Sequence, residues 1–508
     1  MTRLSRNIVY NVAGQGAVLI ISLVAVRFIF GRLGADVFGI IFFNQVVTLL
    51  LANLLDLGLS STIVREVSSH FDVEREYVRD LIRTATAVYW AIGLVLVGVI
   101  WVAAPLLVTH WLNLRTMDAG TATTMLRILS ALALVALPKS LYTSLFRGRQ
   151  MMGLNNSIDV GTAIIQQAGI LLLLLGGGHA FAVAAWISIS ALLGILVYTM
   201  LAARLFGWTD LVPRFSMHAA RRNVGFTGHM MVISILSFIH YQAAQVIVSK
   251  LMTLAQFGYY GFISSTVNRA TFVTGAIAQA AYPSFSNLSG QESRGDLLIQ
   301  YRKLHDLVSF GTLPLFAGIC FAAVPVYSYV FSSGSIAAGL LLPTAFLALG
   351  SWMNATVVIP YMLSLAMGKP QIAARLNVYA LILVLPVTLL LILAFGLPGA
   401  GFSWVFYHLF AYAYMVPRIS RECLGTPARD WYWHIARVYG LALITYGVAW
   451  LVISTLGPGP DSLVADLIGY VVGSGLFCLG AYLMIGPDLR QTIQRLPVSL
   501  AIRKAGAH

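Results

Sequence analysis

Apolar runs of roughly 20 residues, the length that spans a bilayer as a helix, follow one another along the chain. Only 10% of the 508 residues are charged, whereas soluble domains carry about 25%. The pattern predicts an all-α polytopic membrane protein with about 14 transmembrane helices. The expected runs lie near residues 7–30, 39–63, 84–109, 121–145, 155–176, 179–203, 224–249, 257–283, 304–331, 337–365, 372–395, 399–417, 436–456 and 463–486.

Basic residues predict the orientation. All but seven of the 32 Lys and Arg lie in the two tails and at the loops after even-numbered runs. The positive-inside rule then places both termini in the cytoplasm, in a cytoplasmic (inner) membrane. The net charge of +14 therefore indicates orientation and not a nucleic-acid partner. The seven exceptions are Arg27, Arg32, Arg115, Arg127, Lys139, Lys250 and Arg269.

The chain repeats itself at an offset of about 220 residues. "FGIIFF" around Gly39 matches "FGYYGF" around Gly258, and "YVRDLIR" matches "LLIQYR" at the same offset of 219. "FRGRQ" matches "AMGKPQ", and "GGGHAFAVAAW" matches "GLPGAGFSWVF", both at 220. Four matches in order indicate a repeat. Because the unit holds six helices, we expect two parallel lobes with a binding region between them.

The repeat predicts three parts: an N-lobe over 1–215, a C-lobe over 216–425, and two further helices with a tail over 426–508. The three cysteines are far apart and have no metal-ligand spacing. P-loop and GxGxxG signatures are absent from the sequence, and the outer loops are short with few acids. We therefore expect no metal, no cofactor and no enzymatic activity.

Arg269 lies about halfway along the apolar run 257–283. A mid-membrane arginine costs roughly 3 kcal/mol on insertion scales. Arg269 is too deep for its side chain to reach the interface. We therefore expect it either to line a cationic cavity between the lobes or to form a buried ion pair. The only acid at a comparable depth is Asp56, which could instead cap a helix break at Gly58 or form a coupling-ion site.

Other polar residues inside the runs are candidates for lining the same cavity. Lys139 and Arg127 could also snorkel to an interface, and the uncharged groups could also serve helix packing through hydrogen bonds. These uncharged candidates are His240, Gln242, Gln245, Gln166 and Asn354, and His408 is expected to be a packing residue.

Five stretches of the sequence resemble the Wzx-like polysaccharide biosynthesis proteins, which are oligosaccharide flippases of the multidrug/oligosaccharidyl-lipid/polysaccharide (MOP) exporter superfamily. They are "NVAGQGAVLIISLVAVRFIFGRLGADVFGIIFF", "LLDLGLSSTIVREVS", "QFGYYGF", "AQAAYPSFSNLSG" and "AMGKPQ", within residues 1 to about 420. The resemblance implies two six-helix lobes around a central cavity, with two extra helices. It also implies a lipid-linked oligosaccharide on a polyprenyl pyrophosphate carrier, moved to the outer leaflet for O-antigen or exopolysaccharide biosynthesis.

The resemblance leaves several points open. Coupling to a proton or sodium gradient is one, because the seventh helix has "HYQAAQ" where such proteins often carry an acid. Contact with a polysaccharide polymerase and with glycosyltransferases is another. Three alternatives also remain: an organic-cation or multidrug antiporter of the same superfamily, a membrane-embedded polysaccharide polymerase, and a membrane scaffold that transports nothing.

Overall fold

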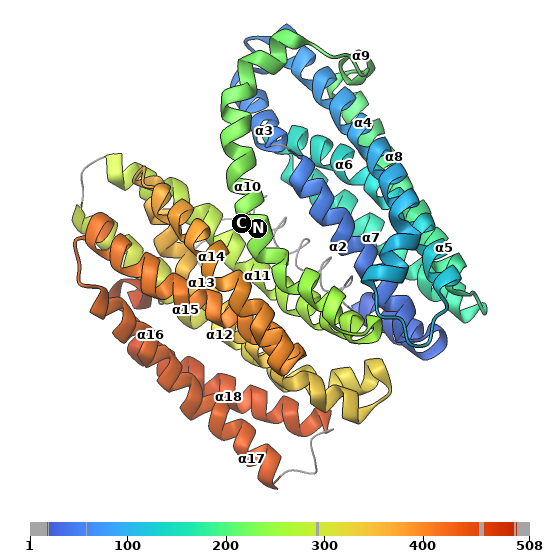
Figure 1. Ribbon diagram of the computed structural model, residues 1–508. Coiled ribbons are helices and arrows are strands. Elements are labelled where there is room, and N and C mark those ends of the chain that lie inside the picture. Colours follow the sequence, from blue (N-terminus) through green and yellow to red (C-terminus); the bar gives the residue numbers. More distant parts are fainter. Residues whose placement is uncertain are drawn as a thin grey trace, which may run out of the picture. The chain divides into compact units, whose positions relative to one another are not determined.

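The computed structural model describes residues 18, 20–56, 58–290, 294–456, 462–491 and 494. Helices account for nearly all of these residues, and the part described contains no strand, only an isolated bridge between Asn113 and Thr253. Figure 1 shows the helices in chain order. The chain divides into two compact units, Met1–Gly261 and Phe262–His508.

Unit 1 begins with a helix over residues 20–33. Its further helices are α2 (Ala35–Leu55), α3 (Leu59–His70), α4 (Arg75–Leu106), α5 (Ala119–Leu129), α6 (Ala131–Gly148), α7 (Met152–Leu175), α8 (Ala180–Phe206), α9 (Trp208–Leu211), α10 (Met217–Leu251) and the start of α11 (Leu254–Gly290). A short π-helical segment, Leu107–Trp111, extends α4.

Unit 2 holds the rest of α11, followed by α12 (Arg294–Phe331), α13 (Gly334–Ala366), α14 (Gln371–Phe395), α15 (Leu397–Ile419), α16 (Ala428–Ala442), α17 (Val448–Leu456) and α18 (Leu463–Met484). π-helical segments follow α15 and α16, at Ser420–Leu424 and Leu443–Gly447.

The expected all-α membrane fold is confirmed. Helix accounts for nearly all the described residues of the fourteen expected runs. Within the described residues, ten helical stretches are long and apolar enough to cross a membrane. The four expected runs outside those ten are 7–30, 224–249, 257–283 and 399–417, which correspond to the helix over 20–33 and to α10, α11 and α15.

Two expected runs are broken in the structure. The run 39–63 divides between α2 and α3, where Gly58 has a φ of +72° that favours glycine. The run 121–145 divides at Ser130, whose hydroxyl donates to the carbonyl of Arg127 at 2.6 Å. Such a side-chain bond competes with the helical ladder. α10 packs on α2, α3 and α4 and belongs to unit 1, because the boundary between the two units follows Gly261.

The core of unit 1 lies among α3, α4, α6 and α8. Four large aromatic side chains there are almost fully buried: Tyr89, Tyr142, Phe146 and Tyr198. Close helix contacts need glycine, since a Cβ atom at Gly93 would lie 2.8 Å from the carbonyl oxygen of Leu134. α4 and α6 therefore pack backbone to backbone at this point.

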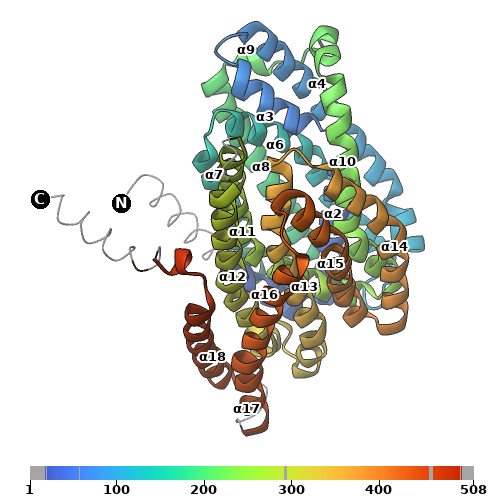
Figure 2. The same cartoon turned by 90° about the vertical axis from the view of Figure 1, so that its left-hand side faces the viewer.

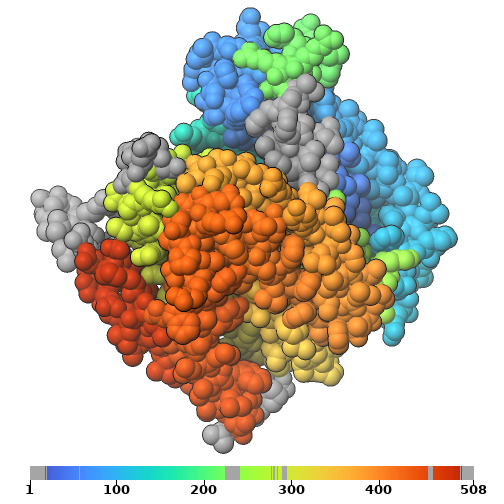
Figure 3. All heavy atoms as spheres, turned by 60° about the vertical axis from the view of Figure 1, so that its left-hand side comes forward, coloured from blue at the N-terminus to red at the C-terminus, as the bar shows by residue number. Residues whose placement is uncertain are grey.

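The core of unit 2 lies around α13, which packs between α12 and α15. Trp352 is buried there and donates its Nε1–H to the carbonyl of Ser309 at 3.0 Å. Figure 2 shows α16, α17 and α18 as the last helices of the chain, and α18 packs on α12. Apolar side chains cover their outer surface, with Leu443, Ile444 and Val464 exposing 68–70%. Figure 3 shows part of this surface in orange and red.

Candidate functional site

Asp56 lies at the break between α2 and α3. Its Oδ1 accepts hydrogen bonds from the hydroxyls of Ser60 and Tyr89, each at 2.5 Å. The Ser60 hydroxyl also lies 2.6 Å from that of Ser140 on α6. Within the described residues Asp56 has no ion-pair partner. The carboxylate is therefore held by hydroxyl groups of α3 and α4, at the break that the sequence suggested near Gly58.

Lys139 precedes Ser140 on α6 and forms an ion pair with Asp159 of α7, with 2.8 Å between Nζ and Oδ1. The hydroxyl of Tyr198 on α8 donates to the same oxygen at 3.0 Å. Side chains of α6, α7 and α8 thus meet at the Asp159 carboxylate, and the charge of Lys139 is neutralised by an ion pair. The sequence analysis did not single out Asp159, although an acid near the start of the apolar run 155–176 is a usable signal.

Arg127 and Gln166 are also in unit 1. Arg127 is half-buried, and its guanidinium lies 5.4 Å from the ring centroid of Trp101, which is itself 50% exposed. An arginine on an exposed tryptophan is typical of an interfacial anchor, so this contact favours that role over cavity lining. Gln166 is half-buried, and its main-chain carbonyl accepts the Nε1–H of Trp186 at 3.0 Å.

The polar residues expected on the seventh helix lie on α10. Gln242 is 4% exposed, and its Oε1 has no hydrogen-bond partner in the described part of the chain. A buried amide oxygen without a partner costs roughly 1–3 kcal/mol, so Gln242 is the side chain here that most needs a ligand or water. Gln245 is half-buried. The side chain of His240 lies outside the described residues.

Arg269 lies on the part of α11 that belongs to unit 2. Its side chain is exposed in the protein alone, with no hydrogen-bond or ion-pair partner within the described residues. Asn354 on α13 is half-buried. His408 on α15 is buried, and its Nδ1 lies 2.8 Å from the carbonyl oxygen of Trp404, a contact that fits its expected packing role.

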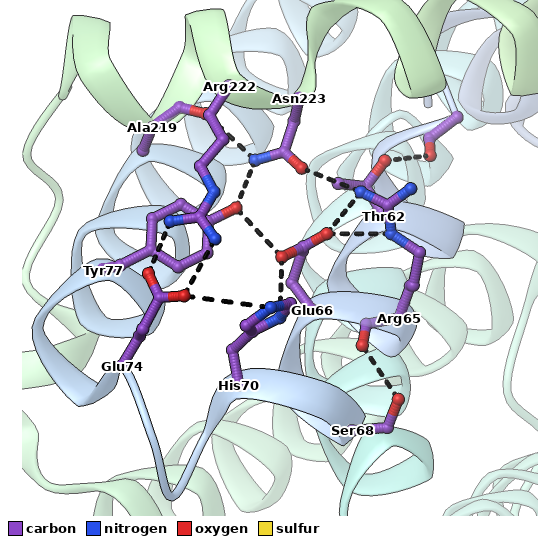
Figure 4. Close-up of polar contacts among 11 residues, drawn as sticks. Thr62, Arg65, Glu66, Ser68, His70, Glu74, Tyr77, Ala219, Arg222 and Asn223 are labelled. Carbon is purple, nitrogen blue, oxygen red and sulfur yellow. Dashed lines mark hydrogen bonds and ion pairs between the residues drawn. The ribbon is translucent and has the colours of Figure 1, made fainter.

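A polar cluster on α3, α4 and α10, at the end of unit 1 that the charge pattern assigns to the cytoplasm, was not anticipated from the sequence (Figure 4). Its centre is Glu66, whose side chain is 4% exposed. Glu66 accepts hydrogen bonds from Arg65 Nε at 2.8 Å and from the hydroxyl of Tyr77 at 3.1 Å, and His70 Nδ1 lies 3.1 Å away. The buried carboxylate thus has two hydrogen-bond donors and a neighbouring imidazole.

The same cluster connects α10 to α4. Arg222 forms a two-point ion pair with Glu74, at 2.5 and 3.0 Å, and its guanidinium lies 3.9 Å from the ring centroid of Tyr77. Asn223 donates to the hydroxyl of Tyr77 at 2.7 Å. The hydrogen bond from Arg222, with the positive charges of Arg222 and His70, holds the pKa of Glu74 below its ordinary value. Nothing in the sequence indicated this contact among four side chains, because the two residues on α10 lie almost 150 residues after their partners.

Comparison with known proteins identifies the family. The family model described as "Polysaccharide biosynthesis protein" matches residues 31–334, more than half of the chain. The chain belongs to this family. The resemblance noted in the sequence is confirmed.

One curated relative and two solved structures are similar to the chain. A Shigella flexneri protein named "Putative O-antigen transporter" is 22% identical over 412 residues, covering 78% of this chain and 93% of that protein. The lipid II flippase MurJ in an inward closed conformation superposes with a TM-score of 0.72 at 13% identity, covering 94% of this chain and 98% of MurJ. An inward-facing multidrug MATE transporter of the MOP superfamily superposes with a TM-score of 0.62 at 14% sequence identity, covering 79% of this chain and 94% of that transporter. The fold is therefore that of MOP transporters.

The family match covers most of the candidate residues. Asp56, Lys139, Gln242 and Arg269 lie inside residues 31–334, whereas Asn354 lies beyond them. The structure connects Asp56 to Ser140, the neighbour of Lys139, through the hydroxyl of Ser60. Within the described residues, no group of three or more His, Cys, Asp and Glu side chains could hold a metal ion.

Proposed function

We propose that this protein flips a polyprenyl-pyrophosphate-linked oligosaccharide from the inner to the outer leaflet of the cytoplasmic membrane. The family, the name of its Shigella relative and the MOP transporter fold support a transporter in polysaccharide biosynthesis. The observation that carries the proposal is Arg269, an exposed cation without a partner in the described residues, on a helix expected to cross the membrane.

The chemistry of the cargo explains such a residue. A pyrophosphate that leaves the interface needs a fixed cation along its path, because bare anions are costly in hydrocarbon. Arginine stays protonated and can donate two parallel hydrogen bonds to phosphate oxygens. Arg269 lies 15 residues into α11, roughly 22 Å along its axis. In this proposal the lobes alternate in access, the head group meets Arg269, and the lipid tail stays in the bilayer.

The test is the leaflet distribution of lipid-linked glycan in cells that carry Arg269 variants. Arg269→Ala should block export with the protein still inserted and folded, and Arg269→Glu should block it completely. Arg269→Lys should keep partial activity because the charge remains without the planar fork. Arg127→Ala is the matched control, since that arginine is occupied by Trp101. Normal export by a stable Arg269→Ala protein would refute the role of Arg269.

Asp56 supports a second candidate, an antiporter of organic cations. A carboxylate without an ion-pair partner at a helix break is also the kind of group that binds a coupling proton or sodium ion. The two can be separated with Asp56→Asn. Loss of resistance to cationic drugs, with unchanged glycan export, would favour the antiporter. Loss of the ion-gradient dependence of glycan export would assign Asp56 to coupling.

The proposal places the protein in the inner membrane, with both termini in the cytoplasm and no catalytic step of its own. A reporter fused at Gly178, between α7 and α8, should therefore report an external position. Deletion of the protein should build up lipid-linked units in the inner leaflet. If single repeat units gathered in the outer leaflet instead, the protein would be a polymerase. Contact with the polymerase and glycosyltransferases of the same process is expected on functional grounds.

A further inference from the structure

Two glycines of unit 1 bring α2 and the first turns of α11 into direct backbone contact. A Cβ atom at Gly39 would lie 2.4 Å from the carbonyl oxygen of Leu254, a distance that side chains do not tolerate. A Cβ atom at Gly258 would lie 3.2 Å from the amide nitrogen of Gly39 and 3.4 Å from the carbonyl oxygen of Ala35. Only small residues allow two helices to approach so closely. We call this contact the glycine joint.

The joint has internal symmetry. Gly258 follows Gly39 by 219 residues, and Leu254 follows Ala35 by the same 219, the offset of the repeat. Gly39 meets Leu254, and Gly258 meets Ala35. Each contact is therefore the repeat-equivalent of the other, which is the pattern of a self-complementary contact on a two-fold axis. A chance crossing of two helices has no reason to pair repeat-equivalent positions in this way.

Hydrogen bonds hold the joint at one side. Asn113, which follows the π-helical segment after α4, donates its Nδ2–H groups to the carbonyls of Lys250 and Met252, at 2.8 and 3.2 Å. Its own carbonyl accepts the N–H of Leu254 at 3.0 Å. These three bonds fix the corner between α10 and α11, and we call them the asparagine clasp. Trp111 adds a fourth bond, from Nε1 to the hydroxyl of Ser249, at 3.0 Å.

We propose that the glycine joint and the asparagine clasp form the outer gate of the transporter, closed in this structure and opened once in each cycle. They lie together at the end of unit 1 that the distribution of Lys and Arg places outside the cell. α11 continues from the joint into unit 2 and reaches Arg269 eleven residues after Gly258, roughly 16 Å further on. Parting the joint therefore moves the helix that carries the proposed anion site.

The chemistry of the contact suits a gate. The clasp consists of neutral hydrogen bonds to main-chain carbonyls, each worth roughly a 2- to 10-fold change in an equilibrium. At the joint the Leu254 side chain lies over Gly39, and Phe42 of α2 packs on Phe257 of α11, so opening separates apolar surfaces as well as the clasp. The inference rests on the alternating access proposed above. The experiments below measure whether the gate is open or closed separately from the export of glycan. Failure of the gate proposal can therefore be distinguished from failure of the proposed function.

The first experiment locks the gate. Asn113→Cys and Thr253→Cys, in a protein whose three native cysteines are replaced, pair residues that form a bridge in the structure. Paired backbones lie about 4.8 Å apart, within the range of a disulfide. Oxidation should cross-link them and stop export, and a reducing agent should return export to the level of the reduced double-cysteine protein. The control pair, Asp118→Cys with Thr121→Cys, stays within one helix start and should leave export unchanged. Absence of the cross-link, or full export by the locked protein, overturns the proposal.

The second experiment loosens the gate by substitution and measures its opening directly, without an export assay. A Thr253→Cys reporter is labelled from outside with a membrane-impermeant maleimide. Gly39→Ala should raise the labelling rate most and Gly258→Ala less, in the order of the clashes at 2.4 and 3.2 Å. Asn113→Ala, which removes two bonds, should raise it roughly 5- to 50-fold.

Gly275→Ala is the matched control for these substitutions, because that glycine is on the same helix and a Cβ atom there would meet nothing within 4 Å. It should leave the labelling rate unchanged. Equal labelling across all the glycine variants overturns the glycine joint, whatever the cargo of the protein.

Discussion

Removing the hydroxyl of Tyr77 should loosen the polar cluster around Glu66 by an amount that the structure allows us to work out. The hydroxyl donates to the buried carboxylate of Glu66 at 3.1 Å and accepts from Asn223 at 2.7 Å. Tyr77→Phe loses both bonds and keeps the ring beneath Arg222. Hydrogen bonds to charged groups contribute about 1.5–3 kcal/mol, and neutral ones about 1 kcal/mol.

Other donors limit the loss. Glu66 keeps its bond from Arg65, and Asn223 keeps its bond to the carbonyl of Ala219 at 3.0 Å. We therefore expect Tyr77→Phe to lower the free energy of unfolding by about 2–3 kcal/mol. Glu66→Gln should cost a similar amount. The contribution of Arg65 is small because its side chain is 43% exposed, and exposed pairs give about 0.2–1 kcal/mol.

The two changes share one hydrogen bond, so a double-mutant cycle should give a coupling energy of about 1–2 kcal/mol. The assay is reversible unfolding of the purified protein in mixed micelles, titrated with denaturing detergent. Tyr379→Phe is the control, because that tyrosine is exposed on α14 and should change stability by less than about 0.5 kcal/mol. Additive effects, or a Tyr77→Phe loss no larger than the control, would refute the reasoning.

Three further predictions follow from single contacts. Lys139→Met should lower the melting temperature in detergent only slightly, because the side chains of its ion pair are 42–49% exposed and such pairs contribute about 0.2–1 kcal/mol. Asp159→Asn should lower it more, because Asp159 also accepts the Tyr198 hydroxyl. Gly169→Ala should destabilise unit 1 by about 1–3 kcal/mol, since its Cβ would lie 2.0 Å from Trp186 Nε1, whereas Gly161→Ala on the same helix meets nothing within 4 Å. The pKa of Glu74 lies below the ordinary glutamate value of 4.5, so its ion pair stabilises the fold above that pH and is lost as the pH falls through the lowered pKa. Melting curves from pH 7 to pH 3 should therefore lose part of their acid-side slope in Glu74→Gln.

The positions of the helices could be predicted from the sequence because the bilayer fixes their length. The sections of chain that cross lipid must be apolar for about 20 residues, and this requirement applies to each helix separately. The breaks at Asp56–Gly58 and at Ser130 were harder to predict. They depend on one glycine with a positive φ and on one serine hydroxyl, and both residue types also occur within continuous membrane helices.

The contacts of the candidate residues could not be predicted in the same way. Depth in the membrane can be counted along a helix, and it drew attention to Arg269 and Asp56 in advance. Partners depend on which helices are neighbours and how each is rotated. Asp159 was therefore missed as the partner of Lys139, and Arg127 was considered for a cavity although it rests on Trp101. The cluster around Glu66 was missed for the same reason.

The two ends of α10 are fixed to unit 1 by different chemistry, and the difference bears on how a transporter could open. The helix runs for 35 residues, roughly 52 Å. At one end, Arg222 forms a charged two-point ion pair with Glu74, beside the buried Glu66. At the other end, the asparagine clasp holds Lys250 and Met252 next to the glycine joint. The Lys250 ammonium also donates to the main-chain carbonyl of His110, and within the described residues this end has no ion pair. Surface ion pairs weaken with salt, whereas neutral bonds do not. A rigid helix held at both ends can be released at one end while the other acts as its pivot, so the two attachments together permit movement at one face of the membrane at a time.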